Sequence, residues 1–372
     1  MNNTVRIGLG VGLLVLAVLV VVAIKFFGGD AGTVLSRQPS CTPITVRGYF
    51  GGEKSSFLKD QDVIRVLKDR YCITLDARKA GSTEMVRDII LTPQDDFLWP
   101  SNQVALALYK QRNGLMVGSA NIFNSPLVIY TWTELSKALE KQGIVTERGG
   151  VYYITDFKKL ADLIKSGATW TSIGMHGMSG KIGIRTTDPN VSNSGAMFAA
   201  LLAGAINNGE VPDDLSIDKI LPELGAFFAR LGFMEQSSED LFQQYLTTGI
   251  GAKPMVAGYE SQLVEYWLQN PNERQLLKDD RRVLYPDPTV WSSHPLIART
   301  ANGKRLLEAL KDPEIQELAW KAHGFRSGLA GIKSDPSALQ GMGGVALDIT
   351  SVMDMPAPNI FDRILNKLAG RP

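Results

Sequence analysis

The stretch KIGIRTTDPNVSNSGAMFAALLAGAI, from Lys181 to Ile206, joins a β-like run to a helix through a short polar turn. Lys181 to Arg185 is the expected strand, and Ser194 to Ile206 is an expected helix of mostly small, uncharged residues. Ser and Asn, which precede the helix, are residue types that cap helix N-termini. We therefore expect the chain to pass from a strand end directly into the start of a helix.

Three other loops follow the same plan, namely 51–56, 81–83 and 259–261. The free backbone N–H groups at a helix start bind polar or anionic groups, and the helix dipole assists them. For any single loop, simple capping by serine is a sufficient explanation. Four such loops in one chain favour a cleft that they share.

The elements around these loops alternate between the two types. Strands are expected at Ile44–Phe50, Ile73–Ala77, Leu127–Trp132 and Pro254–Gly258, and helices at Phe57–Asp69, Glu84–Leu91, Phe157–Ile164, Glu260–Leu268 and Glu314–Ala322. This order predicts α/β units with a parallel sheet covered on both faces. In open α/β sheets a ligand binds where the carboxyl ends of the strands meet the loops.

The N-terminus departs from the average composition. Residues 7–24 carry no charged side chain, and the span to residue 27 is long enough to cross the hydrocarbon layer of a bilayer. A cleaved signal peptide would have a shorter apolar core and a better cleavage site. We expect an uncleaved anchor in a bacterial inner membrane, with residues 7–27 in the lipid bilayer and the body on the extracytoplasmic side.

Charge excludes one class of partner. The chain has 372 residues, with 39 basic and 38 acidic side chains and a net charge of +1. Nucleic-acid binding would require a basic excess, so we expect none.

The chain contains two cysteines, Cys41 and Cys72, and each stands just before a β-like run. Neighbouring parallel strands would bring both to the same end, close enough for a disulfide. A disulfide would agree with an oxidising compartment. Two free buried thiols are the alternative.

Several motifs together resemble a known family. They are GYFGGEKSSFL (48–58), AGSTEMV (80–86), TTDPNVSNSG (186–195), PMVAGYESQL (254–263), YPDPTVWSSHPLIA (285–298) and AWKAHGFRS (319–327). This pattern resembles the type II periplasmic solute-binding proteins, which include sulfate- and molybdate-binding receptors and proteins fused to a von Willebrand-type domain. The motifs are specific for the fold and not for the ligand.

The resemblance implies an α/β, two-lobed type II periplasmic-binding-protein fold, here with an N-terminal transmembrane helix. The implied divisions are an anchor (1–27), a tether (28–40), lobe one (41–124 and 288–344), lobe two (125–287) and a tail (345–372). Ligand would bind between the lobes as they close about a hinge. The implied ligand contacts are Glu53, Lys54, Ser55, Ser82, Thr83, Asp188, Ser192, Asn193, Ser194, Gly195, Tyr259 and Glu260.

The resemblance implies a binding protein, with no cofactor or metal and no catalytic residues, for a small polar or anionic ligand. Glu53 and Glu260 would repel a dehydrated anion unless paired, so either they face outward or the ligand carries an amine or many hydroxyls. The three histidines lack metal-ligand spacing. A transporter or membrane complex is the expected partner, and a scaffold or sensor subunit with a degenerate cleft is the alternative function.

The tail contains one more expected helix. Ile360, Phe361, Ile364, Leu365 and Leu368 share one helical face, and Gly370 would end the helix. This face would pack on the body, or it would dock on a partner or the membrane.

Overall fold

A computed structural model describes residues 41–371 apart from Asn113 and Gln340. The expected membrane anchor and tether lie outside the described residues. Within the described part of the chain, no helix is long and apolar enough to cross a membrane.

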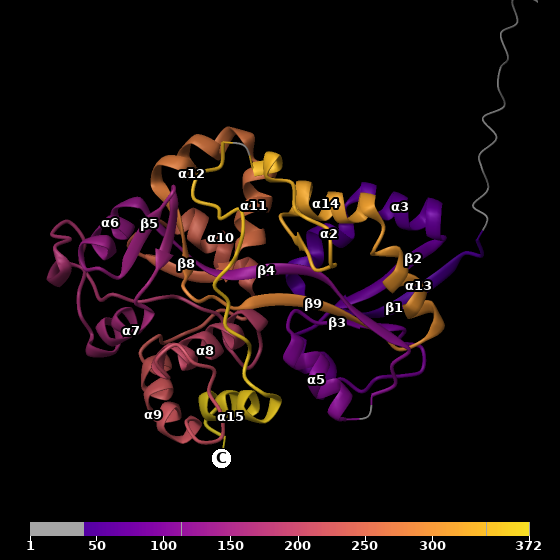
Figure 1. The fold of residues 1–372 in the computed structure, drawn as a ribbon, viewed down its shortest axis with the longest axis horizontal. Helices are drawn as coiled ribbons and strands as arrows, with labels where there is room; N and C mark the ends of the chain where they lie inside the picture. The colour runs from indigo at the N-terminus through magenta and orange to yellow at the C-terminus, as the bar shows by residue number, and fades with distance from the viewer. Residues whose placement is uncertain (1–40, 113, 340, 372) are drawn as a thin grey trace, which may run out of the picture. The chain divides into compact units, whose positions relative to one another are not determined.

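One long strand, β4 (Gly118–Trp132), connects the two halves of the main sheet. The strands are β1 (Ile44–Phe50), β2 (Ile73–Lys79), β3 (Phe97–Trp99), β4 (Gly118–Trp132), β5 (Val145–Arg148), β6 (Val151–Ile154), β7 (Met255–Tyr259), β8 (Arg281–Pro286), β9 (Trp291–Ala298) and β10 (Arg326–Ser327). Their order is β2-β1-β3-β9-β4-β8-β6-β5, and β7 and β10 also pair with β4. β4 pairs with β9 over residues 118–126 and with β7 and β8 over residues 127–132. The same strand therefore runs through both lobes (Figure 1).

Helices cover both lobes. Lobe one carries α2 (Ser55–Lys59), α3 (Gln61–Tyr71), α4 (Ser82–Arg87), α5 (Gln103–Gln111), α13 (Ala301–Ala309) and α14 (Pro313–His323). Lobe two carries α6 (Thr133–Lys141), α7 (Phe157–Ser166), α8 (Asn193–Ile206), α9 (Ile217–Phe228), α10 (Ser238–Thr248), α11 (Glu260–Gln269) and α12 (Arg274–Asp280). Short 3₁₀ turns lie at Gly52–Lys54, Thr171–Ile173, Pro271–Glu273 and Pro336–Leu339, and the last helix is α15 (Pro358–Leu368).

Most of the expected elements form where the sequence pattern places them. The strand at 44–50 is confirmed, and the helix capped by Asp156 forms as α7, with the Asp156 carboxylate accepting the Lys159 N–H. The expected helix at 57–69 is divided into α2 and α3, because Asp60 adopts an extended conformation and caps the second helix. The expected strand at 181–185 is wrong as a regular strand, since this segment forms only isolated bridges at Lys181 and Arg185.

The prediction of a parallel sheet is correct in part. β1 pairs in parallel with β2 and β3, and β6 with β8. β4 pairs antiparallel with β7, β8 and β9, so a fully parallel sheet is wrong. The reason is connectivity: β4 leads from lobe one into lobe two and β9 leads back, so the two strands run in opposite directions.

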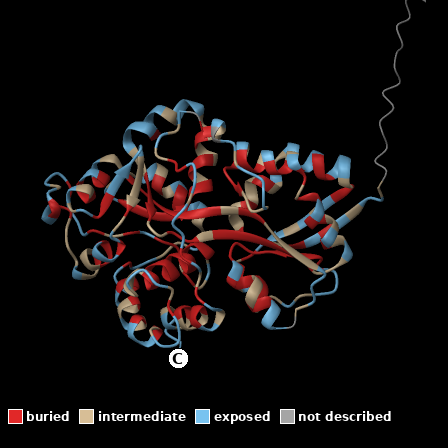
Figure 2. Cartoon of the chain, in the orientation of Figure 1, coloured by how far each residue is buried: buried red, intermediate tan, exposed pale blue. Residues whose placement is uncertain are grey.

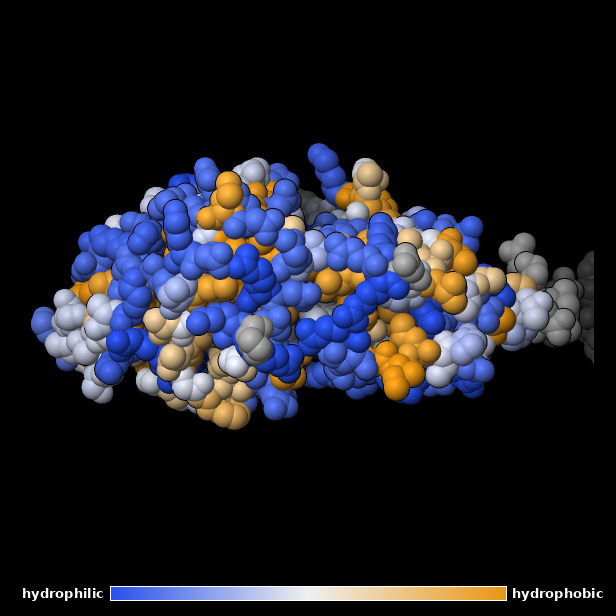
Figure 3. Space-filling view, turned by 90° about the horizontal axis from the view of Figure 1, so that it is seen from below, coloured by the Kyte–Doolittle hydropathy of each residue, from blue (hydrophilic) through white to orange (hydrophobic). Residues whose placement is uncertain are grey.

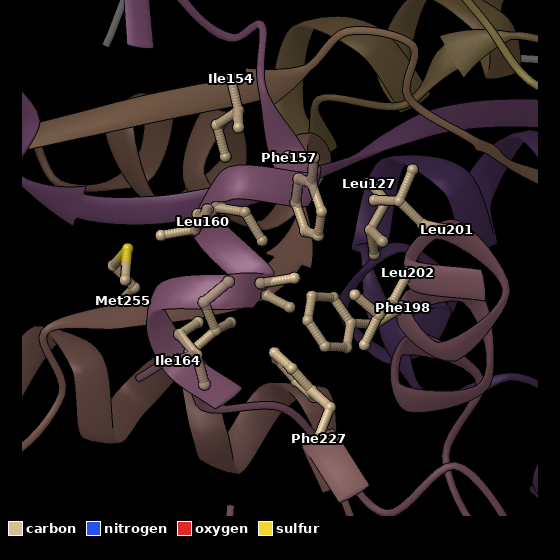
Figure 4. Packing of buried hydrophobic residues seen from close by; sticks show 14 of the residues in the cluster. Leu127, Ile154, Phe157, Leu160, Ile164, Phe198, Leu201, Leu202, Phe227 and Met255 are labelled. Atoms are coloured by element: carbon tan, nitrogen blue, oxygen red, sulfur yellow. The ribbon is translucent and has the colours of Figure 1, made fainter. Parts of the chain in front are cut away.

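Each lobe has its own hydrophobic core, and buried residues follow the crossing strands through the centre (Figure 2). In lobe two, Phe157 and Leu160 of α7 face Phe198 and Leu202 of α8, and Phe227 of α9 closes the cluster (Figure 4). α8 approaches the neighbouring turn closely, since a Cβ added at Gly195 would lie 2.1 Å from the Thr187 carbonyl oxygen. From below, the surface is mainly hydrophilic with separate hydrophobic patches (Figure 3).

The predicted disulfide is confirmed. Cys41 and Cys72 are the two cysteines of the chain, and both are disulfide-bonded. Cys72 directly precedes β2, which pairs in parallel register with β1 from Ile44 opposite Ile73. The strand argument therefore identified the correct pair.

The tail helix α15 lies against both lobes. It contacts α5 of lobe one and α8 and α9 of lobe two (Figure 1). Ile360 and Ile364 belong to the core of lobe two, whereas Phe361 and Leu365 belong to a second cluster that includes Met85. Of the two interpretations that the sequence left open, packing on the body is the one found.

Candidate functional site

A pocket of about 360 Å³ lies where loops of the two lobes meet. Lobe one contributes the ends of β1 and β2 and the start of α4, and lobe two contributes the end of β7 and the starts of α8 and α10. Its lining residues are Gly51, Gly52, Glu53, Lys79, Ala80, Gly81, Ser82, Glu84, Val191, Ser192, Asn193, Gln236, Ser237, Ser238, Asp240 and Tyr259. The volume is within the range of sites that hold small molecules.

Three of these loops are helix starts, and they differ in how the helix start is capped. Gly81 precedes α4, and its N–H donates to the Glu84 carboxylate at 2.9 Å, so this helix start is fixed by a residue of its own first turn. Ser192 and Ser237 occupy the N-cap positions of α8 and α10 without a side-chain cap hydrogen bond. Uncapped helix starts leave backbone N–H groups for solvent or a ligand.

The structure brings part of the predicted set together. Five of the twelve predicted ligand contacts line the pocket, namely Glu53, Ser82, Ser192, Asn193 and Tyr259.

The other small predicted residues lie near this pocket without lining it. Ser55 lines a smaller pocket of about 170 Å³, which shares Gly52 and Glu53 with the first. Thr83 is half-buried in the first turn of α4. Ser194 is fully buried, with its hydroxyl 2.7 Å from that of Thr187.

Two predicted acidic residues have internal partners. Asp188 accepts the Asn190 N–H at 2.8 Å and so shapes the turn before α8. Glu260 is 1% exposed and accepts two hydrogen bonds from Arg326, at 2.6 and 2.9 Å. The Tyr285 hydroxyl donates to the same carboxylate at 2.5 Å. Sequence reasoning left open whether Glu260 faces a ligand, and here its charge is neutralised within the protein.

Glu53, which lines the pocket, belongs to a buried ion pair of lobe one. Lys54 is fully buried, and its ammonium contacts the Glu53 carboxylate, the Ser101 hydroxyl at 2.9 Å and His294 Nδ1 at 3.1 Å. An ammonium has three N–H donors, so these three acceptors satisfy it completely. Since Nδ1 accepts, Nε2 carries the imidazole proton and faces the Ser292 hydroxyl at 3.3 Å.

Electrostatics keeps this group in one protonation state at neutral pH. Burial would raise the pKa of Glu53, but the attraction of Lys54 outweighs it and holds the pKa well below its usual range. Burial, with repulsion from Lys54, lowers the pKa of His294 to about 4. Lys54 and Glu53 therefore form a charged pair beside a neutral imidazole.

Hydrogen bonds extend from this centre into lobe two. The Ser292 hydroxyl donates to the Ser101 carbonyl at 2.9 Å, and the Asn193 amide donates to the same carbonyl at 2.9 Å. Asn193 also donates to the Tyr259 hydroxyl at 2.9 Å and accepts a hydrogen bond from Asn102. Asn193 therefore joins the predicted Tyr259 to Ser101 and Asn102, which the sequence reasoning did not single out.

Sequence reasoning missed the segment from Gln236 to Asp240, which forms one wall of the pocket. A signal was present, since Ser237-Ser238-Glu239-Asp240 has the serine and acidic spacing that opens helices. Lys79 was also missed. It lies opposite this wall, with its ammonium 3.8 Å from the Glu239 carboxylate.

The charge of the pocket wall is mainly acidic. The Glu84 carboxylate accepts the Gly81 N–H at the start of α4. Asp240 is exposed in the first turn of α10 and has no ion pair among the described residues. Within residues 41–371, no group of three His, Cys, Asp or Glu residues is placed to hold a metal ion.

Comparisons with solved structures identify the fold. The chain is similar to apo ferric ion-binding protein A of Pasteurella haemolytica, with 14% identity, 88% of this chain and 97% of that chain covered, and a TM-score of 0.57. It is similar to the periplasmic binding protein AfuA of Actinobacillus pleuropneumoniae with fructose-6-phosphate bound, with 14% identity, 88% of this chain and 98% of that chain covered, and a TM-score of 0.57. It is also similar to the substrate-binding protein of an ABC transporter from Agrobacterium tumefaciens, with 14% identity, 88% of this chain and 95% of that chain covered, and a TM-score of 0.54.

No model of a known protein family matches the sequence, and no curated protein matches it. At 14% identity, the similarity to solved structures establishes the fold alone. The chain has the two-lobed fold of the periplasmic binding proteins.

Proposed function

We propose that this chain is an extracytoplasmic solute-binding protein that holds a small polar solute in the pocket of about 360 Å³ between its lobes. One observation carries the proposal: loops far apart in the sequence meet around a single pocket, and several of them are helix starts. In α/β folds this is where ligands bind. The fold shared with ABC-transporter and other periplasmic binding proteins supports the proposal.

The lining favours a solute with an amine or many hydroxyls. Asp240 offers an unpaired carboxylate, and Ser192, Ser237 and Ser238 offer hydroxyls. An unhydrated anion would meet the carboxylates of Glu84 and Asp240 at the same wall, and their repulsion would weaken its binding. The finer resemblance to sulfate and molybdate receptors remains a prediction, which the ligand screen below includes.

The test is a thermal-shift screen on the full-length chain in mild detergent. The compounds are polyols, sugars, amino acids and polyamines, and sulfate and molybdate are included as anions. A solute at a hundredfold excess over its Kd adds about 2.7 kcal/mol to the free energy of unfolding. We expect a polyol, sugar or amine-bearing solute to raise the melting temperature.

A matched pair of variants then locates the site. Asp240→Asn removes the pocket carboxylate, and Glu134→Gln removes an exposed carboxylate from the first turn of α6, away from the pocket. Both lose a similar interaction with a helix dipole. We expect Asp240→Asn to weaken an amine-bearing solute by about tenfold or more, because a hydrogen bond between charged groups is lost. Equal effects of the two variants would contradict the proposed site.

The alternative function, a scaffold that keeps the fold with a degenerate cleft, is favoured by a different observation. Asn193 of lobe two is hydrogen-bonded to Ser101 and Asn102 of lobe one, and α15 packs against both lobes. Both features oppose separation of the lobes. A binding protein must open and close, whereas a scaffold has no such requirement.

Lobe motion separates the two functions. Dyes on Lys68→Cys of α3 and Lys137→Cys of α6, with the native disulfide intact, report the distance between the lobes by energy transfer. A solute-binding protein shows a change of transfer efficiency with a solute from the screen. A single unchanged efficiency, together with no hit in the screen, supports the scaffold.

We further propose that residues 7–27 anchor the chain in the bacterial inner membrane and that the body meets a transporter or another membrane complex. The support is the apolar run, and a disulfide that requires an oxidising compartment. Mass measurement of the membrane-extracted protein tests the anchor. A mature chain that begins after residue 27 would contradict it.

A further inference from the structure

A second pocket, of about 450 Å³, lies in lobe two and shares no lining residue with the pocket between the lobes. Its apolar part is made by buried side chains, among them Trp170, Ile182 and Ile184. The Trp170 N–H of the backbone donates to the Gly180 carbonyl at 3.1 Å, so the indole is held beside the segment that forms the wall. This wall is the segment just before the TTDPN turn.

Three cations surround this pocket, and its lining contains no carboxylate. Lys181, Arg185 and Arg230 are exposed, and within the described residues none of them forms an ion pair. Lys181 and Arg230 come close together, since a methyl group at Gly167 would lie 3.9 Å from Lys181 Cε and 3.5 Å from Arg230 Nη1. Like charges this close repel one another, and an anion between them would relieve the repulsion.

Lys253 adds a positive charge beside Arg185. One guanidinium N–H of Arg185 donates to the Leu231 carbonyl at 2.9 Å. The other N–H donors of the guanidinium remain available to a ligand. Burial lowers the pKa of the neighbouring Lys253, Glu235 opposes this effect, and repulsion from Arg185 adds to it. Glu235 is thus engaged by Lys253, at 3.8 Å, and does not neutralise Arg185.

An unsatisfied buried donor points to a ligand independently of the charges. Trp170 is fully buried, and its indole Nε1–H has no acceptor among the described residues. Most buried polar groups have a hydrogen-bond partner, so this donor is available to a bound group that supplies an oxygen. Trp170 lines the pocket, so a ligand oxygen that reached the indole N–H after a small adjustment of the lining would satisfy it.

We propose that this pocket binds a phosphate monoester carried on a flat apolar body. The dianionic phosphate lies between Lys181, Arg185 and Arg230, and the apolar body covers Ile182 and Ile184. Arginine suits this role because its planar fork donates two parallel hydrogen bonds to phosphate. The apolar floor distinguishes the pocket from a site for inorganic phosphate.

Calorimetric titration of the full-length chain with phenyl phosphate tests the proposal, with inorganic phosphate and phenol as comparison probes. We expect phenyl phosphate to bind more tightly than either probe. The variant pair Lys181→Gln with Arg230→Gln should weaken it by about tenfold or more, since two charge-assisted contacts are lost. Trp170→Phe keeps the ring and removes the N–H, and should weaken it by a smaller factor.

The control pair is Lys219→Gln with Lys333→Gln, which removes the same charge from exposed positions that do not line the pocket. It should change the affinity less than about twofold, because distant surface charges are screened by salt. No measurable binding of phenyl phosphate overturns the proposal, as does an equal loss in the control pair. Equal affinity for inorganic phosphate overturns the role of the apolar floor. Binding here is independent of the solute screen, because the two pockets share no residue.

Discussion

The two lobes are joined on opposite sides of the crossing strands by contacts of opposite chemistry. On one side, α15 places Phe361 and Leu365 in an apolar cluster with Met85 of α4 and Leu108 of α5. On the other side, where α11 and α14 lie, His323 contacts Glu265 at 2.6 Å and Asp60 at 2.9 Å (Figure 1). Glu265 belongs to α11 of lobe two, and Asp60 precedes α3 of lobe one.

The difference teaches which conditions can separate the lobes. An apolar contact is non-directional and responds little to pH or salt. A bridge of charged groups depends on protonation and on geometry. The hydrogen bonds of Asn193 in lobe two with Ser101 and Asn102 in lobe one also join the lobes and belong to the polar class. Separation of the lobes must therefore overcome two kinds of interaction that no single change of solvent removes together.

The largest effect is expected at the apolar contact. Phe361→Ala removes a fully buried ring and should lower the free energy of unfolding by about 3–5 kcal/mol. Phe233→Ala is the matched control, because its ring is 80% exposed, and it should cost less than about 0.5 kcal/mol. Urea denaturation measures both. Similar small losses in the two variants would mean that α15 does not hold the lobes.

The buried ion pair gives the next effect. Lys54→Met leaves the Glu53 carboxylate buried without its cation, which should cost about 3 kcal/mol. We expect the lower end of the usual range, because Ser101 and His294 still face the carboxylate. Adding Glu53→Gln should recover part of the loss, since no uncompensated charge remains. A double-mutant cycle in urea measures the coupling, and additive losses would show that the pair is not coupled.

The histidine bridge should make stability depend on pH. Burial lowers the pKa of His323, but its hydrogen bonds with Glu265 and Asp60 outweigh this effect and raise the pKa above 6.5. The bridge therefore stabilises the fold fully below pH 6.5, and its contribution is lost as the pH rises through the folded-state pKa. His294 titrates in the opposite sense: its pKa of about 4 means that its contribution is lost as the pH falls from 6.5 to 4, so this loss has begun at pH 6. Comparison of the His323 variant with the wild type cancels it, because both retain His294.

His323→Gln should cost about 1.5–3 kcal/mol at pH 6, as expected for hydrogen bonds between charged groups, and less at pH 9. Replacement of the exposed His176 by Gln is the control and should leave the pH profile unchanged. Unfolding free energies at pH 6 and pH 9 measure the effect. A variant whose stability changes between pH 6 and pH 9 with the same slope as the wild type would show that His323 is not the titrating bridge.

The sequence predicted the features that depend on local pattern. β1 and α7 follow from the alternation of apolar residues and from the Asp156 cap, and the disulfide follows from two cysteines at strand starts. The features that it could not predict depend on distant partners. Nothing near Lys54 in the sequence indicates that His294, 240 residues away, accepts a hydrogen bond from its ammonium.

The tail helix shows the same division. The apolar face of α15 is evident from its spacing, and the sequence left open what would cover it. Only tertiary structure shows that Ile360 packs in lobe two while the next residue, Phe361, packs in a cluster that reaches lobe one.

The smallest effect is expected from the charged contact of α15, and it decides whether the tail belongs to the apolar class. Arg363 of α15 forms an ion pair with Asp218 of α9, and both side chains are exposed, at 37% and 75%. Exposed ion pairs typically contribute no more than about 0.5 kcal/mol, because water and salt screen them. We expect a coupling energy of this size from a double-mutant cycle of Arg363→Ala and Asp218→Ala, and its loss in 1 M salt. A coupling above about 1 kcal/mol would contradict the comparison between the two sides of the lobes, because charge would then contribute to the contact that we assign to apolar packing.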